Sequence, residues 1–416
     1  MKVFKFGGAS LKDAAGVKNV AAIIRSYLPS QLLVVVSAMG KTTNALEKIL
    51  LSSQNSVAHM AELNTLRAYH DTIMRSLFTI PHTVFDEVGT QFDDIERELA
   101  KAAPYDQVYD QVVSKGELIS SIIVSNFLTQ SSIGNHWLDA RTCITTDKTF
   151  REGKVNWTAT REAITNIVSD ASSVYITQGF IGRSPDGFTT TLGREGSDFS
   201  AAIFASSLNA ESVTIWKDVP GVMSADPKRL PNPIVFEELP FKEAAEMTYY
   251  GASVIHPKTI KPLANSSIPL LVKNFENPAL KGTIIHECIV KKLPPLTVFK
   301  DNQCLISCKV TDYTFVSEEQ LSTIFNTLFE LDIRINMMQN SAISFSFCID
   351  FRESKVTALI ERLQKHFEVH YNTGLTLITI KNYDDISFEA YRKKAGILLE
   401  QSSRSTLQVL VREVKG

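Results

Sequence analysis

The sequence lacks the marks of a disulfide-bonded secreted domain and of a structural zinc site. Its cysteines are odd in number and form no C-x-x-C pair, and its eight histidines form no H-E-x-x-H; the five cysteines are Cys143, Cys288, Cys304, Cys308 and Cys348. Cys304 and Cys308 are four residues apart in an expected strand, a spacing that core packing explains more often than a metal does. We therefore expect reduced thiols and a cytoplasmic protein.

Long apolar runs and an excess of one charge are also missing. The run 32–36 is far shorter than the roughly 20 residues that a membrane-spanning helix needs, and Met1 leads directly into a strand, so no signal peptide is expected. The 43 Lys and Arg nearly balance the 45 Asp and Glu. Neither a nucleic-acid surface nor a membrane surface is therefore expected. With 416 residues, 44% of them apolar, the chain is long enough for two or three domains that act on small molecules.

Segments typical of strands and of helices alternate along the first 285 residues. The expected strands are 3–6, 31–36, 133–138, 174–177, 212–216 and 268–273, and helical patterns cover 14–27, most of 45–128, 199–209 and 241–250. Residues 114–118 are expected to interrupt the helices, and 150–155 to form a hairpin. This alternation predicts an α/β fold with a largely parallel sheet between two layers of helices. Ligands of such sheets bind at the carboxyl ends of the strands.

Two glycine turns stand at such strand ends. In T-T-L-G-R-E-G-S-D, Gly193 and Gly196 let the backbone approach a ligand, and Arg194 can pair with a carboxylate or a phosphate. Asp198 precedes the expected helix, whose N-terminus suits an anion. In the simpler alternative, Asp198 only caps that helix. In K-F-G-G, Lys5 could reach phosphates held by the glycine amides, or it could be a solvated lysine beside a turn.

Polar residues follow other expected strands as well. Ser37 and Thr43 belong to S-A-M-G-K-T-T-N, which follows the second strand, although Thr43 could simply be a helix N-cap. Glu117 could hold a substrate ammonium group or be a surface residue. Asp218 follows the strand 212–216, and the turns Pro220-Gly221 and Asp226-Pro227 frame a region suited to a nucleotide base and ribose.

Nine motifs in one order resemble the aspartate kinases of the amino acid kinase superfamily. They are K-F-G-G-A-S, V-S-A-M-G-K-T-T-N, K-G-E-L, L-D-A-R, T-Q-G-F-I-G, T-T-L-G-R-E-G-S-D, K-D-V-P-G-V-M-S-A-D-P-K, Y-G-A-S-V-I-H-P and N-P-x-x-x-G-T, within roughly the first 285 residues. L-D-A-R is similar to the branch of lysine-sensitive aspartokinases and of the kinase half of fused aspartokinase and homoserine dehydrogenase proteins. With 416 residues, the chain is not expected to contain a dehydrogenase as well. The resemblance implies that ATP with Mg²⁺ phosphorylates the β-carboxylate of L-aspartate, the first step towards lysine, threonine and methionine.

The resemblance also implies roles for individual residues. Lys5 and Asp198 would be catalytic, Asp198 by orienting the lysine and metal-bound water. The expected aspartate-binding residues are Ser37, Thr43, Glu117, Phe180, Arg194 and Ser197. The expected ATP-binding residues are Lys5, Gly7, Gly8, Lys217, Asp218, Met223 and Lys228. No protein residue is assigned as a direct metal ligand.

The sequence departs from the family pattern at four positions near these residues. Glu195 stands where a glycine is frequent, Lys217 where threonine is usual and Met223 where tyrosine is usual. Ser253 replaces a lysine thought to help neutralise the nucleotide phosphates. We hypothesise that Lys217 or Lys258 compensates for that lysine, a hypothesis that wild-type-like turnover of both alanine variants would remove.

The remainder of the chain follows a different pattern. After the expected linker 291–295, strands at 303–310, 333–338, 342–349 and 375–380 and helices at 318–331 and 355–366 give the order βαββαβ, a ferredoxin-like motif. It resembles an ACT domain, so we expect a catalytic domain 1–290, an ACT-like regulatory domain 297–383 and a tail 384–416. The tail, with a strand at 407–412, would complete a sheet of this or of another subunit. Effector contacts are expected at Asp312, Phe315, Asn340 and Ser341, and a homodimer or higher oligomer through the ACT-like domains, unless this region is purely structural.

Two other functions stay open on the sequence. A kinase for glutamate, acetylglutamate or carbamate would share K-F-G-G and the sheet, but not naturally L-D-A-R with the ACT-like tail. A non-catalytic amino-acid sensor would explain Met223 and Ser253, and it would bind effector without releasing ADP. The sequence does not identify the effector or the number of subunits.

Overall fold

The computed structural model of the chain describes residues 1–54, 59–168, 174–252, 255–311 and 315–412. It divides into two compact units. The first comprises Met1–Val222, Val235–Ala245 and Val254–Val290, and the second comprises Met223–Ile234, Glu246–Ser253 and Lys291–Gly416. The stretch predicted as the catalytic domain thus contributes two short segments to the second unit. No helix of the described residues is long and apolar enough to cross a membrane.

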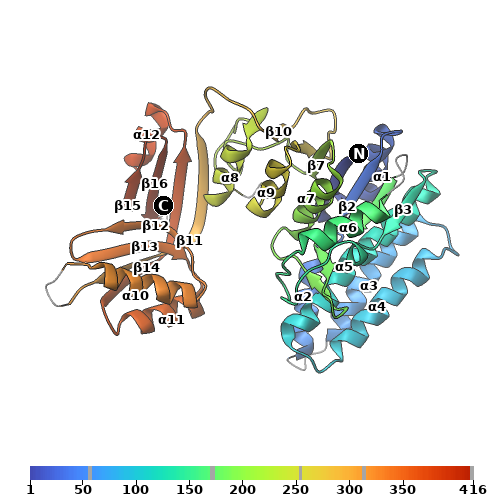
Figure 1. The fold of residues 1–416 in the computed structure, drawn as a ribbon, viewed down its shortest axis with the longest axis horizontal. Helices are drawn as coiled ribbons and strands as arrows, with labels where there is room; N and C mark the ends of the chain where they lie inside the picture. Colours follow the sequence, from blue (N-terminus) through green and yellow to red (C-terminus); the bar gives the residue numbers. More distant parts are fainter. Residues whose placement is uncertain (55–58, 169–173, 253–254, 312–314, 413–416) are drawn as a thin grey trace. The chain divides into compact units, whose positions relative to one another are not determined.

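An eight-stranded sheet forms the middle layer of the first unit (Figure 1). Its order is β3 (Asn135–Leu138), β4 (Val174–Gln178), β2 (Leu32–Val36), β1 (Lys2–Phe6), β7 (Ser212–Lys217), β9 (Leu270–Asn274), β10 (Thr283–His286) and β8 (Glu238–Pro240). All neighbours are parallel except β9 and β10. Every residue of β2 is buried, as expected for a strand covered on both faces. The mainly parallel α/β fold predicted from the alternation is confirmed.

Helices cover both faces of this sheet. On one face α7 (Gly196–Leu208) packs on β1, β2 and β7, and α6 (Trp157–Ile167) and α9 (Pro257–Asn265) pack on α7. On the other face α5 (Tyr105–Gln130) packs on β2, β3 and β4 and contacts α1 (Ala14–Ser26), α2 (Thr42–Gln54) and α4 (Val84–Leu99). The helix α3 (His59–Leu77) packs on α1, α2 and α4. Short elements complete the unit: the 3-10 helices η1 (Gly8–Leu11) and η2 (Ala140–Thr142) and the hairpin of β5 (Ile181–Arg183) and β6 (Thr189–Thr191). The segment α8 (Phe241–Tyr249) follows β8 directly.

Two local predictions for the first unit are wrong. The segment 114–118 does not interrupt the helices, because α5 runs unbroken from Tyr105 to Gln130. Gly116 lies inside α5, where an added Cβ would come within 3.0 Å of Thr42 and 3.2 Å of Ala38 side-chain atoms. The glycine therefore permits close packing and does not end the helix. Residues 150–155 form no hairpin of strands, since only an isolated bridge joins Thr146 to Val155.

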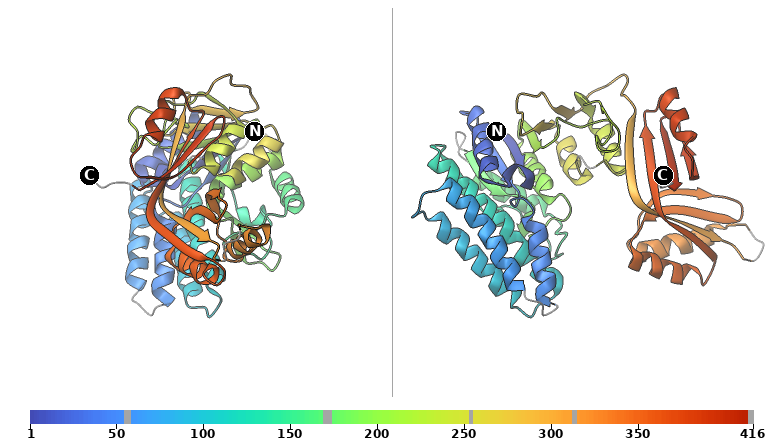
Figure 2. Two further views of the ribbon diagram at one scale, coloured as in Figure 1. Left: turned by 90° about the vertical axis from the view of Figure 1, so that its left-hand side faces the viewer. Right: turned by 180° about the vertical axis from the view of Figure 1, so that it is seen from behind.

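The second unit is built on a six-stranded antiparallel sheet. Its order is β12 (Ile335–Asn340), β13 (Ser344–Asp350), β11 (Leu296–Lys309), β14 (Glu368–Lys381), β16 (Thr406–Arg412) and β15 (Ile397–Ser402). The first four strands with α10 (Glu318–Glu330) and α11 (Glu353–Leu363) have the ferredoxin-like order, confirming the α+β prediction. The long strands β11 and β14 can be followed in Figure 2. Cys304 and Cys308 lie buried in one apolar cluster of this unit, as core packing predicts.

The tail completes this same sheet. Strand β16 pairs with β14 of its own chain over seven residues, from Leu375 opposite Arg412 to Lys381 opposite Thr406, and β15 pairs with β16. The helix α12 (Asp385–Arg392) contributes Phe388 and Tyr391, which pack against the apolar cluster of Ile378, Val409 and their neighbours. Strand β15 was not predicted, since its sequence I-L-L-E-Q-S shows no sustained alternation.

Candidate active site

A cleft of about 740 Å³ opens where β1, β2, β4 and β7 of the first unit end. Its lining combines cationic, acidic and hydroxyl side chains with glycine backbone. The lining residues are Lys5, Gly8, Ser37, Ala38, Gly40, Thr43, Tyr109, Glu117, Arg151, Glu152, Phe180, Gly193, Arg194, Glu195, Gly196, Ser197, Asp198 and Lys217. The parallel strands bring these distant segments together at their carboxyl ends, as expected for an open α/β sheet.

Two lysines share one buried carboxylate at the base of the cleft. Lys5 Nζ lies 2.7 Å from Asp198 Oδ1, and Lys217 Nζ lies 3.8 Å from Asp198 Oδ2. The Asp198 side chain is only 3% exposed. Burial alone would raise the pKa of Asp198, but the charges of Lys5 and Lys217 and the Lys5 hydrogen bond outweigh it, so the pKa is lowered. Asp198 is thus an anion that holds two cations facing the cleft.

The turn before α7 presents a helix N-terminus to the same cleft. Gly193 adopts φ +76°, and Glu195 adopts the left-handed region at φ +53°, so that α7 begins at Gly196. The prediction that Asp198 precedes the helix is wrong, because Glu195 is the N-cap and Asp198 lies in the first turn. The first-turn amides of Gly196 and Asp198 donate to Gly193 O (3.0 Å) and Glu195 O (3.1 Å), and the positive end of the helix dipole still favours an anion at this N-terminus.

The first glycine turn is held by close backbone contacts. The amide of Gly40 donates to Gly8 O (3.0 Å), and a Cβ on Gly8 would lie 2.6 Å from Gly40 O and 2.7 Å from Ala38 O. Only glycine fits such an approach. Gly7 is not among the lining residues, but a Cβ there would come within 3.3 Å of Lys5 Nζ. Gly7 therefore keeps the space beside the ammonium group clear, whereas Gly8 permits the close approach of the backbone of Ala38 and Gly40.

Glu117 contributes a carboxyl group to the lining of the cleft from the middle of α5. It is 2% exposed, and its Oε2 has no hydrogen-bond partner within the described residues. Burial raises the pKa of Glu117 to about 8, opposed by the Lys5 charge and the Ala38 amide. Such a group gains most from a ligand that brings a positive charge and hydrogen-bond donors.

The other residues predicted to bind the amino acid also line the cleft. Ser37 follows β2, and Thr43 lies in the first turn of α2. Phe180 adopts φ +72° and its amide donates to Ser200 Oγ (2.9 Å), which fixes the ring beside Gly196. Ser197 is buried, whereas the Arg194 side chain is exposed at the rim. The structure brings all six predicted aspartate-binding residues to one cleft.

Sequence reasoning missed a further cation of this cleft. The Arg151 guanidinium lies 4.2 Å from the centroid of the Tyr109 ring, and its Nη2 is 3.4 Å from Glu47 Oε1. Buried Asp110 holds the loop by accepting from the Arg151 amide (3.0 Å) and from the Thr191 amide (2.9 Å). Tyr109, Arg151 and Glu152 carry no local motif, since only the tertiary fold brings α5 and this loop together.

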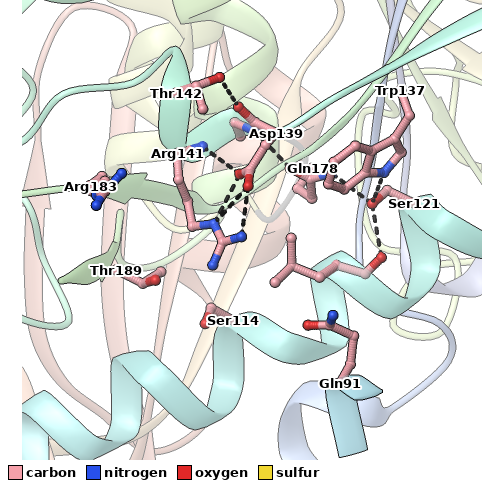
Figure 3. Close-up of polar contacts among 12 residues, drawn as sticks. Gln91, Ser114, Ser121, Trp137, Asp139, Arg141, Thr142, Gln178, Arg183 and Thr189 are labelled. Carbon is pink, nitrogen blue, oxygen red and sulfur yellow. Dashed lines mark hydrogen bonds and ion pairs between the residues drawn. The ribbon is translucent and has the colours of Figure 1, made fainter. Parts of the chain in front are cut away.

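The L-D-A-R element is hydrogen-bonded to the last residue of β4, Gln178, as Figure 3 shows. The Ala140 amide donates to Gln178 Oε1 (2.8 Å), and Gln178 Nε2 donates to Ser121 Oγ (2.7 Å) on α5. Asp139 pairs with Arg141 (2.6 Å) and therefore does not enter the cleft. Gln178 precedes Gly179 and Phe180, so these hydrogen bonds link the position of Phe180 to that of the helix that carries Glu117.

The residues predicted to bind the nucleotide are not all at the cleft. Lys217 ends β7 and lines the cleft, whereas Asp218 does not. Met223 and Lys228 belong to the second unit, and both stay predictions. Ser253 lies outside the described residues.

The other residues singled out from the sequence can be placed only in part. Lys258 is an exposed residue in the first turn of α9. Of the predicted effector residues, Asp312 lies outside the described residues, and Phe315 is 75% exposed. Asn340 ends β12, and Ser341 Oγ lies 2.8 Å from Ser344 Oγ.

Comparisons with known proteins agree on one family. The pattern of the Amino acid kinase family matches residues 1–274. Lysine-sensitive aspartokinase 3 of Escherichia coli (strain K12) is 31% identical over 396 residues, which cover 92% of this chain and 87% of that protein. The chain also matches bifunctional aspartokinase/homoserine dehydrogenase 2, chloroplastic, of Arabidopsis thaliana at 29% identity, with 89% of this chain but only 42% of that protein covered.

A solved structure resembles the chain over nearly its whole length. Aspartokinase III of E. coli in complex with aspartate and ADP, in its R-state, has a TM-score of 0.85 at 28% identity and covers 99% of this chain and 96% of that one. The same enzyme in complex with lysine and aspartate, in its T-state, has a TM-score of 0.81 at 27% identity, with the same coverage.

Proposed function

Because the chain belongs to the aspartokinases of the amino acid kinase family, we propose that it transfers the γ-phosphoryl group of ATP to the β-carboxylate of L-aspartate in the cleft of the first unit. The observation that carries this proposal is the cluster of Lys5, Lys217 and Asp198 beside the N-terminus of α7. Two cations and a helix N-terminus that face one cleft suit a polyphosphate.

The acceptor needs no general base in this reaction. The side chain of aspartate, with a pKa of about 3.9, is already an anion at neutral pH. Phosphoryl transfer then depends on positioning and on neutralising charge on the transferring group. The chain supplies the positive charge through Lys5, which is 12% exposed and fixed by Asp198 at 2.7 Å. Asp198 thus acts by orienting the lysines and does not need to accept a proton.

Lys217 is the better of the two candidates to replace the lysine missing at Ser253. It lines the cleft and lies within 3.8 Å of Asp198, whereas Lys258 is not among the lining residues. A lysine that shares Asp198 with Lys5 can turn towards a phosphate without losing its buried partner. Asp218, Met223 and Lys228 remain our proposed contacts for the rest of the nucleotide.

The acidic groups of the cleft fit a nucleotide that carries Mg²⁺. Magnesium prefers oxygen ligands and usually keeps several waters, and Glu195 Oε2 is buried with no hydrogen-bond partner among the described residues. Glu195 and Asp198 would therefore face the metal side of the bound nucleotide. When bound, Mg²⁺ neutralises negative charge on the phosphates.

The remaining polar residues of the cleft suit the amino acid. Glu117 would accept the α-ammonium group, because its Oε2 is buried with no hydrogen-bond partner among the described residues. Arg194 at the rim, with Arg151 as a second candidate, would pair with the α-carboxylate. The hydroxyls of Ser37, Thr43 and Ser197 and the ring of Phe180 would complete the pocket.

Regulation and assembly are proposed from the second unit. The related E. coli enzyme is lysine-sensitive and binds lysine in its T-state, so we propose an amino-acid effector for this chain, with contacts near Phe315, Asn340 and Ser341. Strand β12 is the edge of the six-stranded sheet, and an edge strand can pair with a second copy. We therefore propose a homodimer through this unit. The unpaired cysteines suit the reducing cytoplasm.

A coupled assay of ADP release tests the proposed function. L-Aspartate, L-glutamate and N-acetylglutamate are each offered with ATP and Mg²⁺, with and without lysine or threonine. The proposal expects turnover on aspartate and its loss in Lys5→Met, while Lys2→Ala on the same strand, which pairs with Glu211 outside the cleft, stays active. Preference for another acceptor would indicate a sibling kinase, and effector binding by the folded chain without any ADP release would indicate a sensor.

A further inference from the structure

Three side chains with metal-binding atoms converge at the edge of the main sheet. Glu238 begins β8, His286 ends β10, and Cys288 follows two residues later. The two strands pair in parallel, with Glu238 opposite Ile284. One carboxylate oxygen, one imidazole nitrogen and the Cys288 sulfur all lie within 4.8 Å of one another. None of the three lines the cleft described above.

The hydrogen bonds of this cluster all end on one carboxylate. His286 Nε2 lies 2.5 Å from Glu238 Oε1. The Cys288 thiol also donates a hydrogen bond to the Glu238 carboxylate. Glu238 therefore accepts from an imidazole and a thiol together. A divalent cation in the middle can take the place of both hydrogen bonds, with the thiol proton released to solvent.

We propose that Glu238, His286 and Cys288 form a site for Zn²⁺ or a divalent cation of similar softness. Zinc binds carboxylate, imidazole and thiolate at about 2.0–2.3 Å, so tetrahedral ligand atoms lie about 3.3–3.8 Å apart. Atoms within 4.8 Å of one another reach that spacing by a movement of about 1 Å, within the range of small side-chain rotations. Mg²⁺ is disfavoured, because it prefers oxygen ligands alone.

The ligands are accessible to a metal from solvent. Glu238 is exposed, His286 and Cys288 are partly buried, and the other four cysteines, all within the described residues, are buried. Three protein ligands leave a fourth position for water, the arrangement of open zinc sites. Cys288 lies three residues before Lys291, where the second unit resumes. Metal binding would therefore link Cys288, near the C-terminal end of the first unit, to Glu238 on β8.

Zinc titration of the full-length chain tests this site. The reduced protein, free of nucleotide because ATP chelates zinc, is titrated with ZnCl₂ in a large excess of Mg²⁺, which occupies sites made of oxygen ligands only. Binding is followed by calorimetry, and protection of Cys288 from alkylation is read by peptide mass spectrometry. Co²⁺ as a probe should add a thiolate-to-metal absorption band.

Variants decide whether this cluster is the site. We expect one Zn²⁺ per chain, binding weakened at least about tenfold in Cys288→Ser, His286→Ala and Glu238→Gln, and no Co²⁺–thiolate band in Cys288→Ser. The matched control is His370→Ala, which removes an exposed histidine paired with Glu368 at 3.0 Å. Circular dichroism confirms that each variant is folded. The proposal would be overturned if the wild-type chain bound no zinc, or if all three cluster variants bound zinc as tightly as the wild-type chain.

Discussion

Replacing Glu117 by glutamine should make the chain more stable at alkaline pH while it weakens aspartate binding. Burial raises the pKa of Glu117 from 4.5 to about 8, against the Lys5 charge and the Ala38 amide. Between those two values the folded chain holds a proton that the unfolded chain has lost, so stability falls as pH rises. The stability contributed by this group is complete below pH 4.5 and is lost by about pH 8.

The size of the effect follows from the width of that window. The difference between 4.5 and about 8 is 3.5 pH units, which at about 1.4 kcal/mol per unit gives about 5 kcal/mol in the free energy of unfolding. A glutamine carries no charge and avoids this loss. Its amide also offers no charge to an ammonium group, so the KM for aspartate should rise about 10- to 100-fold.

Denaturant unfolding of the wild-type chain and of Glu117→Gln across this pH range measures the first effect, and initial rates against aspartate concentration measure the second. Glu152→Gln is the control, because Glu152 lines the same cleft but is exposed. Equal pH dependence of stability in wild type and Glu117→Gln would refute the raised pKa of the buried carboxyl group. An unchanged KM for aspartate would refute its role in binding the ammonium group.

Three further outcomes are expected. Glu195→Gly should stabilise the chain by about 1 kcal/mol, because Glu195 has φ +53° and glycine adopts that region freely. The same change should alter the KM for ATP more than the KM for aspartate. Denaturant unfolding checks the stability, and initial rates check the KM values. Gly8→Ala should lose activity and stability, because its Cβ would lie 2.6 Å from a backbone oxygen that cannot move aside; ADP release and melting temperature measure the losses. Burial lowers the pKa of His70 from 6.5 to about 4, so stability should fall as pH drops through that range, by about 3 kcal/mol in all, and His70→Gln should show a shallower fall in acid denaturation.

The sequence predicted the central strands well, because β-branched runs followed by glycine turns are local signals. The β1 turn at Gly7 and Gly8 and the turn before α7 are of this kind. Local signals failed where tertiary packing decides the structure. Gly116 was expected to break a helix, yet it lies within α5 against Thr42 and Ala38.

The parts of the cleft missed from the sequence have the same cause. Arg151 is positioned by Asp110 and by the ring of Tyr109, two residues of a helix more than 40 residues earlier in the chain. No motif encodes that contact. Likewise Asp198 was expected before the helix, whereas the left-handed conformation of Glu195 starts α7 earlier and turns Asp198 towards Lys5.

The most direct measurement of the central claim is a double-mutant cycle on kcat for Lys5→Met and Asp198→Asn, with Lys2→Ala as the control and folding checked by circular dichroism. If the buried pair at 2.7 Å acts as one unit on the phosphates, each single change should lower kcat by about 100-fold or more, and the double variant should be no slower than the worse single one. Near-wild-type kcat in either single variant, or losses that multiply in the double variant, would contradict the account.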